Sequence, residues 1–275
     1  MWTDLHLHSI ASDGELDPVT LLERAAACGI ERLSITDHDT FAAYRWREGA
    51  VREAARRLEL DLLVGIELDT TLAGREVHLL GYALDPEEPT LAEHLAAVRQ
   101  ARTERARREL TLVNERLGAG TLREEQIFAE GREMPMRPHF IRPLVAQGRF
   151  GSYGEGGAWF RENAAPSQLP KPEVARAIAL IHGAGGWAVL AHPGYYLKAG
   201  LPVLERLAWL REAGLDGVEA DYPYASSSPE VFSAADAERF RAELGPRAES
   251  LGLRLTRGSD IHFAADFARV YGPPD

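Results

Sequence analysis

Residues 2–40 have the sequence WTDLHLHSIASDGELDPVTLLERAAACGIERLSITDHDT, and this stretch decides the fold. The alternation of apolar and polar residues over Trp2–Leu7 predicts a β-strand. Asp17 precedes a proline, which is typical of a helix start, and this helix should run to Ala27. A second strand is expected over Glu31–Thr36. The stretch therefore predicts a strand–helix–strand unit.

The same alternation continues along the chain. Further strands are expected over Leu62–Glu67, Glu76–Tyr82, Trp187–Ala191, Val218–Asp221 and Leu253–Thr256. Further helices are expected over Phe41–Leu58, Pro172–His182, Pro202–Ala213 and Pro229–Ser250. Repeated strand–helix units favour a parallel, barrel-like α/β fold, in which the chemistry lies where the strands end in loops.

The middle of the chain lacks strand signals. Helical patterns are expected over Thr90–Leu117, Thr121–Glu130 and Pro138–Gln147, followed by the glycine-rich stretch Gly148–Gly157. We therefore expect residues 101–165 to form a small helical insert beside the site. The charge run Arg99–Glu109 within it should be a solvated helix face.

Composition limits the class of protein. The 275 residues are 45% hydrophobic and 27% charged, as in an ordinary globular chain that forms one domain or one domain with an insert. A net charge of −11 argues against binding of duplex DNA. Cys28 is the only cysteine, which excludes an internal disulfide and suits a reducing cytoplasm. We see neither a signal peptide nor an apolar run of ~20 residues, so we expect a cytoplasmic protein without membrane contact.

Nine candidate metal ligands fall in five short blocks, each at a predicted strand end or on a predicted strand. They are His6, His8, Asp13, His38, Glu67, His78, His192, Asp260 and His262. One such block would mean little, because a single histidine such as His78 is more often a core residue. Five blocks together indicate a cluster of divalent metal ions and hydrolytic chemistry.

The spacing within the blocks supports this interpretation. Residues i and i+2 of a strand point to the same side, so His6 and His8 should face the site together. Glu67 follows an apolar run at a strand end, where an unpaired carboxylate is costly. Imidazole suits Zn, Mn or Fe(II), and the carboxylates shift the preference toward Mn or Mg. In the block ITDHDT, Asp39 is also a candidate helix cap, and Asp37 is a candidate to orient a ligand imidazole.

The remaining histidines carry less information. His94 should be exposed, and His182 has an ordinary place late in a helix. His139 differs, because Arg137 and His139 stand at the start of a helix in the predicted insert, where a phosphate site and a purely structural role are both open. A base could stack on an aromatic residue, and the candidates are Tyr153, Trp159, Tyr195, Tyr196, Tyr222 and Tyr224.

The blocks TDLHLHSIASDG, ITDHDT, GIEL, VHLLGY, LAHPG and GSDIH resemble the PHP family of metal-dependent phosphoesterases over almost the whole chain. The segment RPHFIRPLV further resembles the branch that acts on nucleoside 3',5'-bisphosphates and on short RNA 5' ends. The resemblance implies a distorted (β/α)7 TIM-like barrel over residues 1–100 and 166–275, with residues 101–165 as a helical insert covering the active site. It also implies three divalent ions, often Mn, with Zn, Fe or Mg as alternatives.

The resemblance also implies roles for the nine residues. The first ion would be held by His6, His8, Glu67 and Asp260, the second by Glu67, His78 and His192, and the third by Asp13, His38 and His262. Arg137 and His139 match the phosphate-binding segment, Lys171 and Arg161 are further candidates, and Asp13 and His38 would meet the substrate through the third ion.

The chemistry expected is hydrolysis without a covalent intermediate, because Cys28 is unsuited and no Gly-x-Ser-x-Gly elbow occurs. A metal-bound hydroxide would attack phosphorus, with Glu67, Asp260 and His192 as the catalytic set. His192 or a metal-bound water would protonate the leaving group. The leading hypothesis is removal of the 3'-phosphate from adenosine 3',5'-bisphosphate to give AMP and phosphate.

Three alternatives stay open. The same site is compatible with 5'-3' exoribonuclease activity on short single-stranded RNA. Histidinol-phosphate phosphatase is the second alternative, although the helical insert argues against it. The third is a non-catalytic, metal-stabilised module, which the retention of all nine ligands disfavours. The expected partner is therefore a small anionic nucleotide or short RNA.

Overall fold

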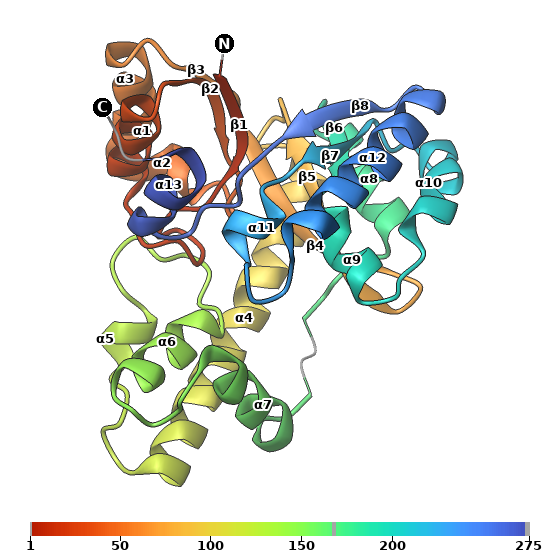
Figure 1. Cartoon of the computed structure of the whole chain (residues 1–275). Helices are drawn as coiled ribbons and strands as arrows, with labels where there is room; N and C mark the ends of the chain where they lie inside the picture. The colour runs from red at the N-terminus through yellow and green to blue at the C-terminus, as the bar shows by residue number, and fades with distance from the viewer. Residues whose placement is uncertain (1, 167–168, 273–275) are drawn as a thin grey trace.

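The computed structural model describes residues 2–166 and 169–272, and it contains two β-sheets surrounded by helices (Figure 1). One sheet has the order β1-β2-β3 and is parallel, with strands Trp2–Leu7, Ile30–Ile35 and Asp61–Leu62. The other has the order β4-β5-β6-β7-β8, with strands Gly65–Leu72, Arg75–Tyr82, Trp187–Leu190, Gly217–Asp221 and Arg254–Arg257.

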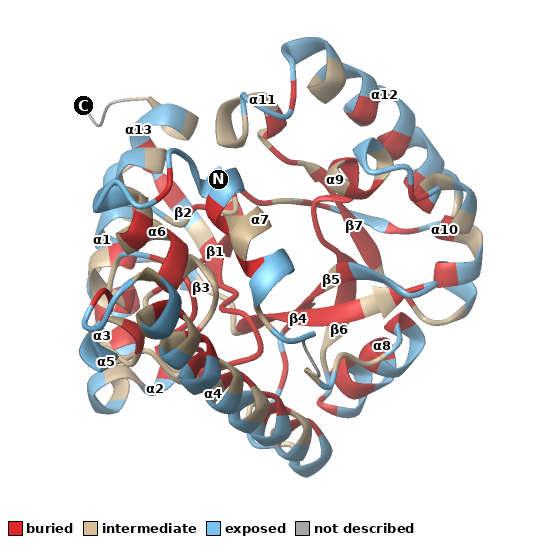
Figure 2. Ribbon diagram, turned by 90° about the horizontal axis from the view of Figure 1, so that it is seen from below, coloured by how far each residue is buried: buried red, intermediate tan, exposed pale blue. Residues whose placement is uncertain are grey.

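The helices of the described chain separate into two groups. Those packed around the sheets are α1 Pro18–Ala27, α2 Ala42–Arg45, α3 Ala50–Arg57, α8 Val174–Gly183, α9 Pro193–Lys198, α10 Val203–Glu212, α11 Tyr224–Ser227, α12 Ala234–Ser250 and α13 Ala264–Tyr271. The others are α4 Pro89–Leu117, α5 Glu124–Ile127, α6 Pro138–Ala146 and α7 Tyr153–Asn163. Figure 2 shows that the strands are mostly buried while the helices around them expose their outer faces.

The fold is a mixed α/β fold, as the alternation of strands and helices predicted, but the strands are not all parallel. β4 and β5 form an antiparallel hairpin, and β5 also pairs with β6 in the antiparallel sense. The tight turn places Ala73 and Gly74 at positive φ. Within the described residues the two sheets are not one closed sheet. They meet through single bridges, Leu7 with Ile261 and His38 with Glu67.

Two predicted elements have different bounds, and one predicted helix start is as expected. Glu67 is the third residue of β4 rather than the last residue of a strand, because the apolar run breaks before Gly65 and the strand then continues. The predicted helix over Phe41–Leu58 is interrupted by Arg47 and Glu48, which both have positive φ. The predicted cap is confirmed, because the Asp17 side chain accepts hydrogen bonds from two backbone amides of α1.

The helices α4 to α7 share an apolar cluster that is separate from the main core. Ala106 and Val113 of α4 contact it together with Phe140 of α6 and Phe160 of α7. In Figure 1 this helical unit lies below the two sheets, and α4 runs from one part to the other. The position of α4 to α7 places a helical layer next to the strand ends that carry the candidate ligands.

The charge run on α4 is only partly the solvated face that was expected, since Arg99, Glu104, Arg107 and Arg108 are exposed. Arg102 is only 1% exposed and Glu109 is only 3% exposed, so both charged side chains are buried. Their partners come from segments far away in the sequence, and charge density alone could not show this.

Across residues 2–166 and 169–272, none of the helices combines the length and apolar character that crossing a bilayer requires.

Candidate metal centre

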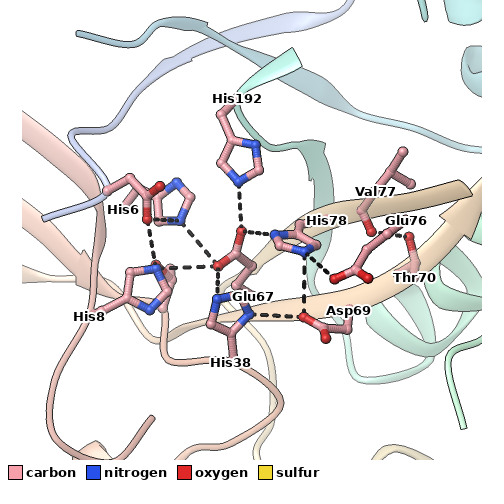
Figure 3. A network of polar contacts seen from close by, with 12 residues as sticks. His6, His8, His38, Glu67, Asp69, Thr70, Glu76, Val77, His78 and His192 are labelled. Atoms are coloured by element: carbon pink, nitrogen blue, oxygen red, sulfur yellow. Dashed lines mark hydrogen bonds and ion pairs between the residues drawn. The ribbon is translucent and has the colours of Figure 1, made fainter. Parts of the chain in front are cut away.

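One carboxylate lies at the centre of the histidine cluster. Glu67 on β4 is 1% exposed, and Figure 3 shows imidazole rings around it on several sides. Its Oε2 atom lies 3.4 Å from Nε2 of His6 and 3.3 Å from Nε2 of His8. The same oxygen lies 3.2 Å from Nε2 of His38. Strand β1, the loop after β2 and strand β4 therefore converge on one oxygen atom.

The second oxygen of Glu67 faces a different pair of rings. Its Oε1 atom lies 3.0 Å from Nδ1 of His78 on β5 and 3.1 Å from Nε2 of His192 at the end of β6. The hairpin register explains the first contact, since His78 pairs with Asp69, two residues beyond Glu67 on β4. The two carboxylate oxygens thus face two separate sets of nitrogen atoms, as a carboxylate that bridges two ions would.

The C-terminal block joins the same cluster. Oδ1 of Asp260 lies 3.0 Å from Nε2 of His8 and 3.3 Å from Nε2 of His6. Asp260 has a positive φ of 56°, and its amide donates to the carbonyl of His6 at 2.8 Å. Nε2 of His262 lies 3.2 Å from Oδ1 of Asp13. The bridge between Leu7 and Ile261 therefore sets the two ends of the chain side by side at the site.

The ligand atoms gather in compact groups that suit divalent ions. One group has atoms of His6, His8, Glu67 and Asp260 within 4.8 Å of one another, and a second has atoms of His8, Asp13, His38 and His262. A third has atoms of His38, Glu67 and His78, so His192 contacts Glu67 but lies outside that compact set. Sequence comparison by motif had not placed His8 in the second group or His38 in the third.

Buried atoms without hydrogen-bond partners support a metal at this place. Nε2 of His6, Nε2 of His8 and Oε2 of Glu67 are buried and make no hydrogen bond in the described structure. Buried polar atoms nearly always have a hydrogen-bond partner. Three neighbouring atoms without one therefore indicate that a bound ion is their partner. A set of imidazole nitrogens and carboxylate oxygens suits Mn, Zn or Fe(II). The residues present therefore fit a group of divalent ions.

In the absence of bound ions, protonated histidines balance the negative charge of the carboxylates in the cluster. Burial raises the pKa of Glu67, but the imidazoles of His38 and His6 lower it more, so that its pKa lies well below the usual range. Burial lowers the pKa of His8, but the carboxylates of Asp260 and Glu67 beside its Nε2 raise it to about 10. Ions that bind to such ligands displace these protons, so metal affinity should increase as pH rises.

A second layer of carboxylates orients the imidazoles, and it was only partly predicted. Glu219 on β7 is fully buried, accepts from Nδ1 of His6 at 3.0 Å, and accepts from the backbone amide of His192 at 2.7 Å. Asp69 on β4 lies 3.0 Å from Nδ1 of His38. Sequence reasoning missed both, although a glutamate inside the buried strand sequence GVEAD was an available signal. Asp37, which was predicted for this layer, instead accepts from Ser9 and Ser12 in the loop after β1.

A buried arginine holds the second layer in place. Nη2 of Arg102 on α4 lies 2.7 Å from Oδ2 of Asp39 and 2.7 Å from Oδ2 of Asp69. Asp39, considered as a helix cap from the sequence, therefore serves as an ion-pair partner. The long helix α4 is connected in this way to the candidate ligand His38 through Asp69.

A cationic cavity of about 540 Å³ adjoins the cluster. Its cations are Arg102, Arg105, Arg137 and Lys171. Nζ of Lys171 lies 3.1 Å from Asp69 and 2.6 Å from Glu76. Glu76 also lines the central cavity of about 330 Å³ that contains the candidate ligands, so the two cavities are contiguous. These four cations outnumber the two carboxylates that line the same cavity, Asp69 and Glu76.

The other substrate candidates lie in different surroundings. Nε of Arg137 pairs with Oε1 of Glu109 at 3.1 Å, and its side chain lines the cationic cavity. His139 is buried, and its Nδ1 accepts from the backbone amide of Met136 at 2.9 Å. Burial, and after it the charge of Arg132, lower the pKa of His139 to about 3, which favours a neutral ring. Arg161 is exposed on α7 and does not line the cationic cavity.

Two histidines outside the cluster and the aromatic candidates can also be placed. His94 is half-buried rather than exposed, and His182 is exposed with Nε2 at 2.8 Å from Asp216. Among the aromatic candidates, Tyr153 is the exposed one, at 49%. The buried ones are Tyr196, Tyr222 and Tyr224, and the half-buried ones are Trp159 and Tyr195.

Comparison with known proteins agrees with this geometry. The family model described as "PHP domain" matches residues 4–119. The chain is 34% identical to the 3',5'-nucleoside bisphosphate phosphatase of Chromobacterium violaceum, over 98% of this chain and 90% of that protein. It is 33% identical to the 5'-3' exoribonuclease Rnm of Escherichia coli, over 94% of this chain and 84% of that protein.

A solved structure shows the same architecture. The crystal structure of a metal-dependent phosphoesterase from Bifidobacterium adolescentis, whose function is given there only by inference, matches with a TM-score of 0.76 at 28% identity. The match covers 100% of this chain and 90% of that chain. The helical unit and the two sheets therefore occur together in a known arrangement.

Proposed function

The chain belongs to the PHP family and is a metal-dependent phosphoesterase, and on this premise we propose that it removes the 3'-phosphate of adenosine 3',5'-bisphosphate to give AMP and phosphate. The observation that carries this choice is the cationic cavity beside the ligand cluster. A monophosphate would need only the metal centre. A bisphosphate carries a second anionic group, and that group needs cations of its own.

We propose that the nine candidate residues hold the ions. The first ion is assigned to His6, His8, Glu67 and Asp260, the second to Glu67, His78 and His192, and the third to Asp13, His38 and His262. The short separations of the first and third sets support this assignment, and the buried atoms without hydrogen bonds support it too. For the second ion, the compact group has His38 with Glu67 and His78, and His192 joins through its contact with Glu67. Mn is the proposed ion, with Zn, Fe or Mg as alternatives. Bound divalent ions supply Lewis acidity, which activates water and neutralises phosphoryl charge.

The protein groups then position the substrate. Arg137 and Lys171 line the cationic cavity and would bind the 5'-phosphate. Arg102, which is buried in the wall of the same cavity, would attract the phosphate through its positive charge. Lys171 pairs with the buried Asp69 and with Glu76. If Lys171 turned toward a phosphate, Asp69 would keep its ion pair with Arg102. The anchored 5'-phosphate would hold the 3'-phosphate over the ligand cluster.

His192 is a further catalytic candidate. It lines the central cavity, and its Nε2 lies 3.1 Å from Oε1 of Glu67. A proton held at Nε2 could pass to the leaving 3'-alkoxide as the P–O bond breaks. One nitrogen cannot hold a metal ion and a proton at the same time, so the ligand role and the proton-donor role of Nε2 exclude each other, and an experiment can decide between them. A His192→Asn variant with full metal content and a low kcat would support proton transfer, whereas loss of metal would support ligation.

A second candidate function is 5'-3' exoribonuclease activity on short RNA. The Escherichia coli relative with that name is about as similar as the phosphatase relative. The central cavity also continues into another cavity on the side of Asp13 and His262, so a chain could extend beyond the cleaved bond. The products differ, because the phosphatase releases phosphate and the exoribonuclease releases nucleoside monophosphates.

A substrate panel tests the proposal. Metal-loaded protein is assayed with adenosine 3',5'-bisphosphate, AMP, histidinol phosphate and a 5'-phosphorylated short RNA. We expect phosphate release from the bisphosphate with accumulation of AMP. Turnover of the RNA alone would replace the phosphatase by the exoribonuclease. Turnover of histidinol phosphate alone would reject a nucleotide substrate, and no turnover of any compound would favour the non-catalytic module.

A further inference from the structure

A second cavity, of about 260 Å³, also adjoins the metal centre. It shares Tyr195, Asp260 and His262 with the central cavity and shares Pro138 with the cationic cavity. Its lining differs from that of the cationic cavity, which contains no aromatic side chain. We call it the aromatic cavity, because Tyr153, Tyr195, Tyr222 and Phe263 line it.

Two of these rings have exposed faces. Tyr153 at the start of α7 is 49% exposed, and Phe263 before α13 is 36% exposed. Tyr222 is 2% exposed, and its hydroxyl donates to Oδ2 of Asp260 at 3.0 Å. Its ring is therefore packed within the protein and does not present a free face to a ligand. An exposed aromatic side chain at a cavity beside a metal cluster is available for stacking against a ligand.

The side chain of Arg142 stacks on the ring of Phe263. The guanidinium carbon of Arg142 on α6 lies 4.1 Å from the centroid of the Phe263 ring, which is a stacking distance. Nη1 of Arg142 donates to the backbone carbonyl of Asp13 at 2.7 Å, which fixes the guanidinium beside a candidate metal ligand. Arg142 therefore connects the helical unit to the metal centre, and together with the ring on which it stacks it forms the Phe263–Arg142 wall of the cavity.

We propose that the aromatic cavity binds the base of the substrate nucleotide, a planar heterocycle, by stacking on Tyr153 and on the Phe263–Arg142 wall. This inference rests on the proposed function, which supplies a nucleotide, and it assigns the residues that choose between a nucleotide and a simple sugar phosphate. Each side cavity then binds one part of the substrate. The second phosphate lies among the four cations of the cationic cavity, and the base lies among the rings of the aromatic cavity. The phosphate to be cleaved lies between them at the ligand cluster.

Equilibrium binding tests the inference independently of turnover. The dissociation constants of AMP and of ribose 5-phosphate, which lacks the base, are measured on Mn-loaded protein by titration calorimetry. The variants are Tyr153→Ala, Phe263→Ala and the ring-retaining Tyr153→Phe. Trp209→Ala is the matched control, because Trp209 is 46% exposed on α10 and lines none of the three cavities.

The expected result is tighter binding of AMP than of ribose 5-phosphate by about tenfold or more, since stacking of one base on an aromatic ring commonly contributes that much. Tyr153→Ala and Phe263→Ala should each weaken AMP about tenfold and leave ribose 5-phosphate unchanged, whereas Tyr153→Phe and Trp209→Ala should bind AMP normally. Equal affinities for the two ligands, or equal losses for both in Tyr153→Ala, would overturn the inference.

The two proposals fail in different ways. A preference for AMP that depends on Tyr153, without hydrolysis of adenosine 3',5'-bisphosphate, would reject the phosphatase and retain the base site. Fast hydrolysis of the bisphosphate together with no preference for AMP over ribose 5-phosphate would retain the phosphatase and reject the base site.

Discussion

Arg102 and Asp69 form a buried ion pair, with Nη2 of the arginine 2.7 Å from Oδ2 of the aspartate. The other oxygen of Asp69 lies 3.0 Å from Nδ1 of His38, so the pair joins α4 to a candidate metal ligand. The same Nη2 atom also lies 2.7 Å from Asp39. One arginine on the helical unit therefore pairs with two carboxylates behind the metal centre.

Replacement of Arg102 by methionine should destabilise the protein strongly. It would leave Asp39 buried without its cation and Asp69 with Lys171 alone, and breaking a buried pair in this way costs about 3–5 kcal/mol. We expect that decrease in the free energy of unfolding, measured by urea denaturation of metal-free protein. Arg108→Met is the control, because Arg108 is exposed on the same helix. A loss below about 1 kcal/mol in Arg102→Met would show that the pair does not hold the helix to the site.

Glu219→Gln should weaken metal binding without unfolding the protein. The carboxylate accepts from Nδ1 of His6 and from the amide of His192, whereas an amide side chain can offer one acceptor oxygen and must turn a donor toward the other group. Loss of such a supporting group typically lowers metal affinity about 10–100-fold. Metal titration of the variant measures this effect, and Glu205→Gln on the exposed side of α10 is the control. Unchanged affinity would remove Glu219 from the account of the site.

His139 should make stability depend on pH. Burial, with Arg132 next, lowers the pKa of His139 to about 3, below its usual ~6.5 in an unfolded chain. The unfolded state therefore binds a proton between these pH values that the folded state excludes. This contribution is fully present above pH ~6.5 and is lost as pH falls toward 3, by roughly 4–5 kcal/mol at most.

The variant His139→Asn isolates that contribution. Asparagine keeps an acceptor for the amide of Met136, which donates to His139 at 2.9 Å, but it does not titrate. Urea unfolding of metal-free protein at several pH values should show that the stability advantage of the wild type over the variant shrinks between pH 6.5 and 4. A constant difference over this range would mean that His139 does not titrate with the shift described. His182→Asn, at an exposed histidine, is the control.

Arg137→Ala and Lys171→Ala should impair the bisphosphate substrate selectively. Both side chains line the cationic cavity, and a hydrogen bond to a charged group contributes about 1.5–3 kcal/mol. For adenosine 3',5'-bisphosphate we expect KM to rise and kcat/KM to fall about 10–150-fold with metal content intact. Hydrolysis of p-nitrophenyl phosphate, which has no second phosphate, should change little. Arg161→Ala is the matched control, and an equal effect of all three variants would argue against the assigned cavity.

The sequence predicted those features that depend on local spacing. His6 and His8 stand two residues apart on a strand, so their common direction followed from strand geometry, and the structure directs both at Glu67. The place of Glu67 inside β4 was not predicted, because the apolar run before it looks like one continuous strand. The roles of Arg102 and Glu219 depend on partners far away in the chain, and no local pattern identifies those partners, although the strand sequence GVEAD indicated that Glu219 is buried.

The central claim is that a cluster of metal ions around Glu67 hydrolyses a nucleoside bisphosphate. The most direct test is the rate of phosphate release from adenosine 3',5'-bisphosphate while Mn²⁺ is added stepwise to metal-free protein. The account predicts no release without metal and a rate that keeps rising beyond one equivalent of Mn²⁺ per chain, with AMP as the product. Release that is complete without added metal, or no release at any Mn²⁺ concentration, would contradict it.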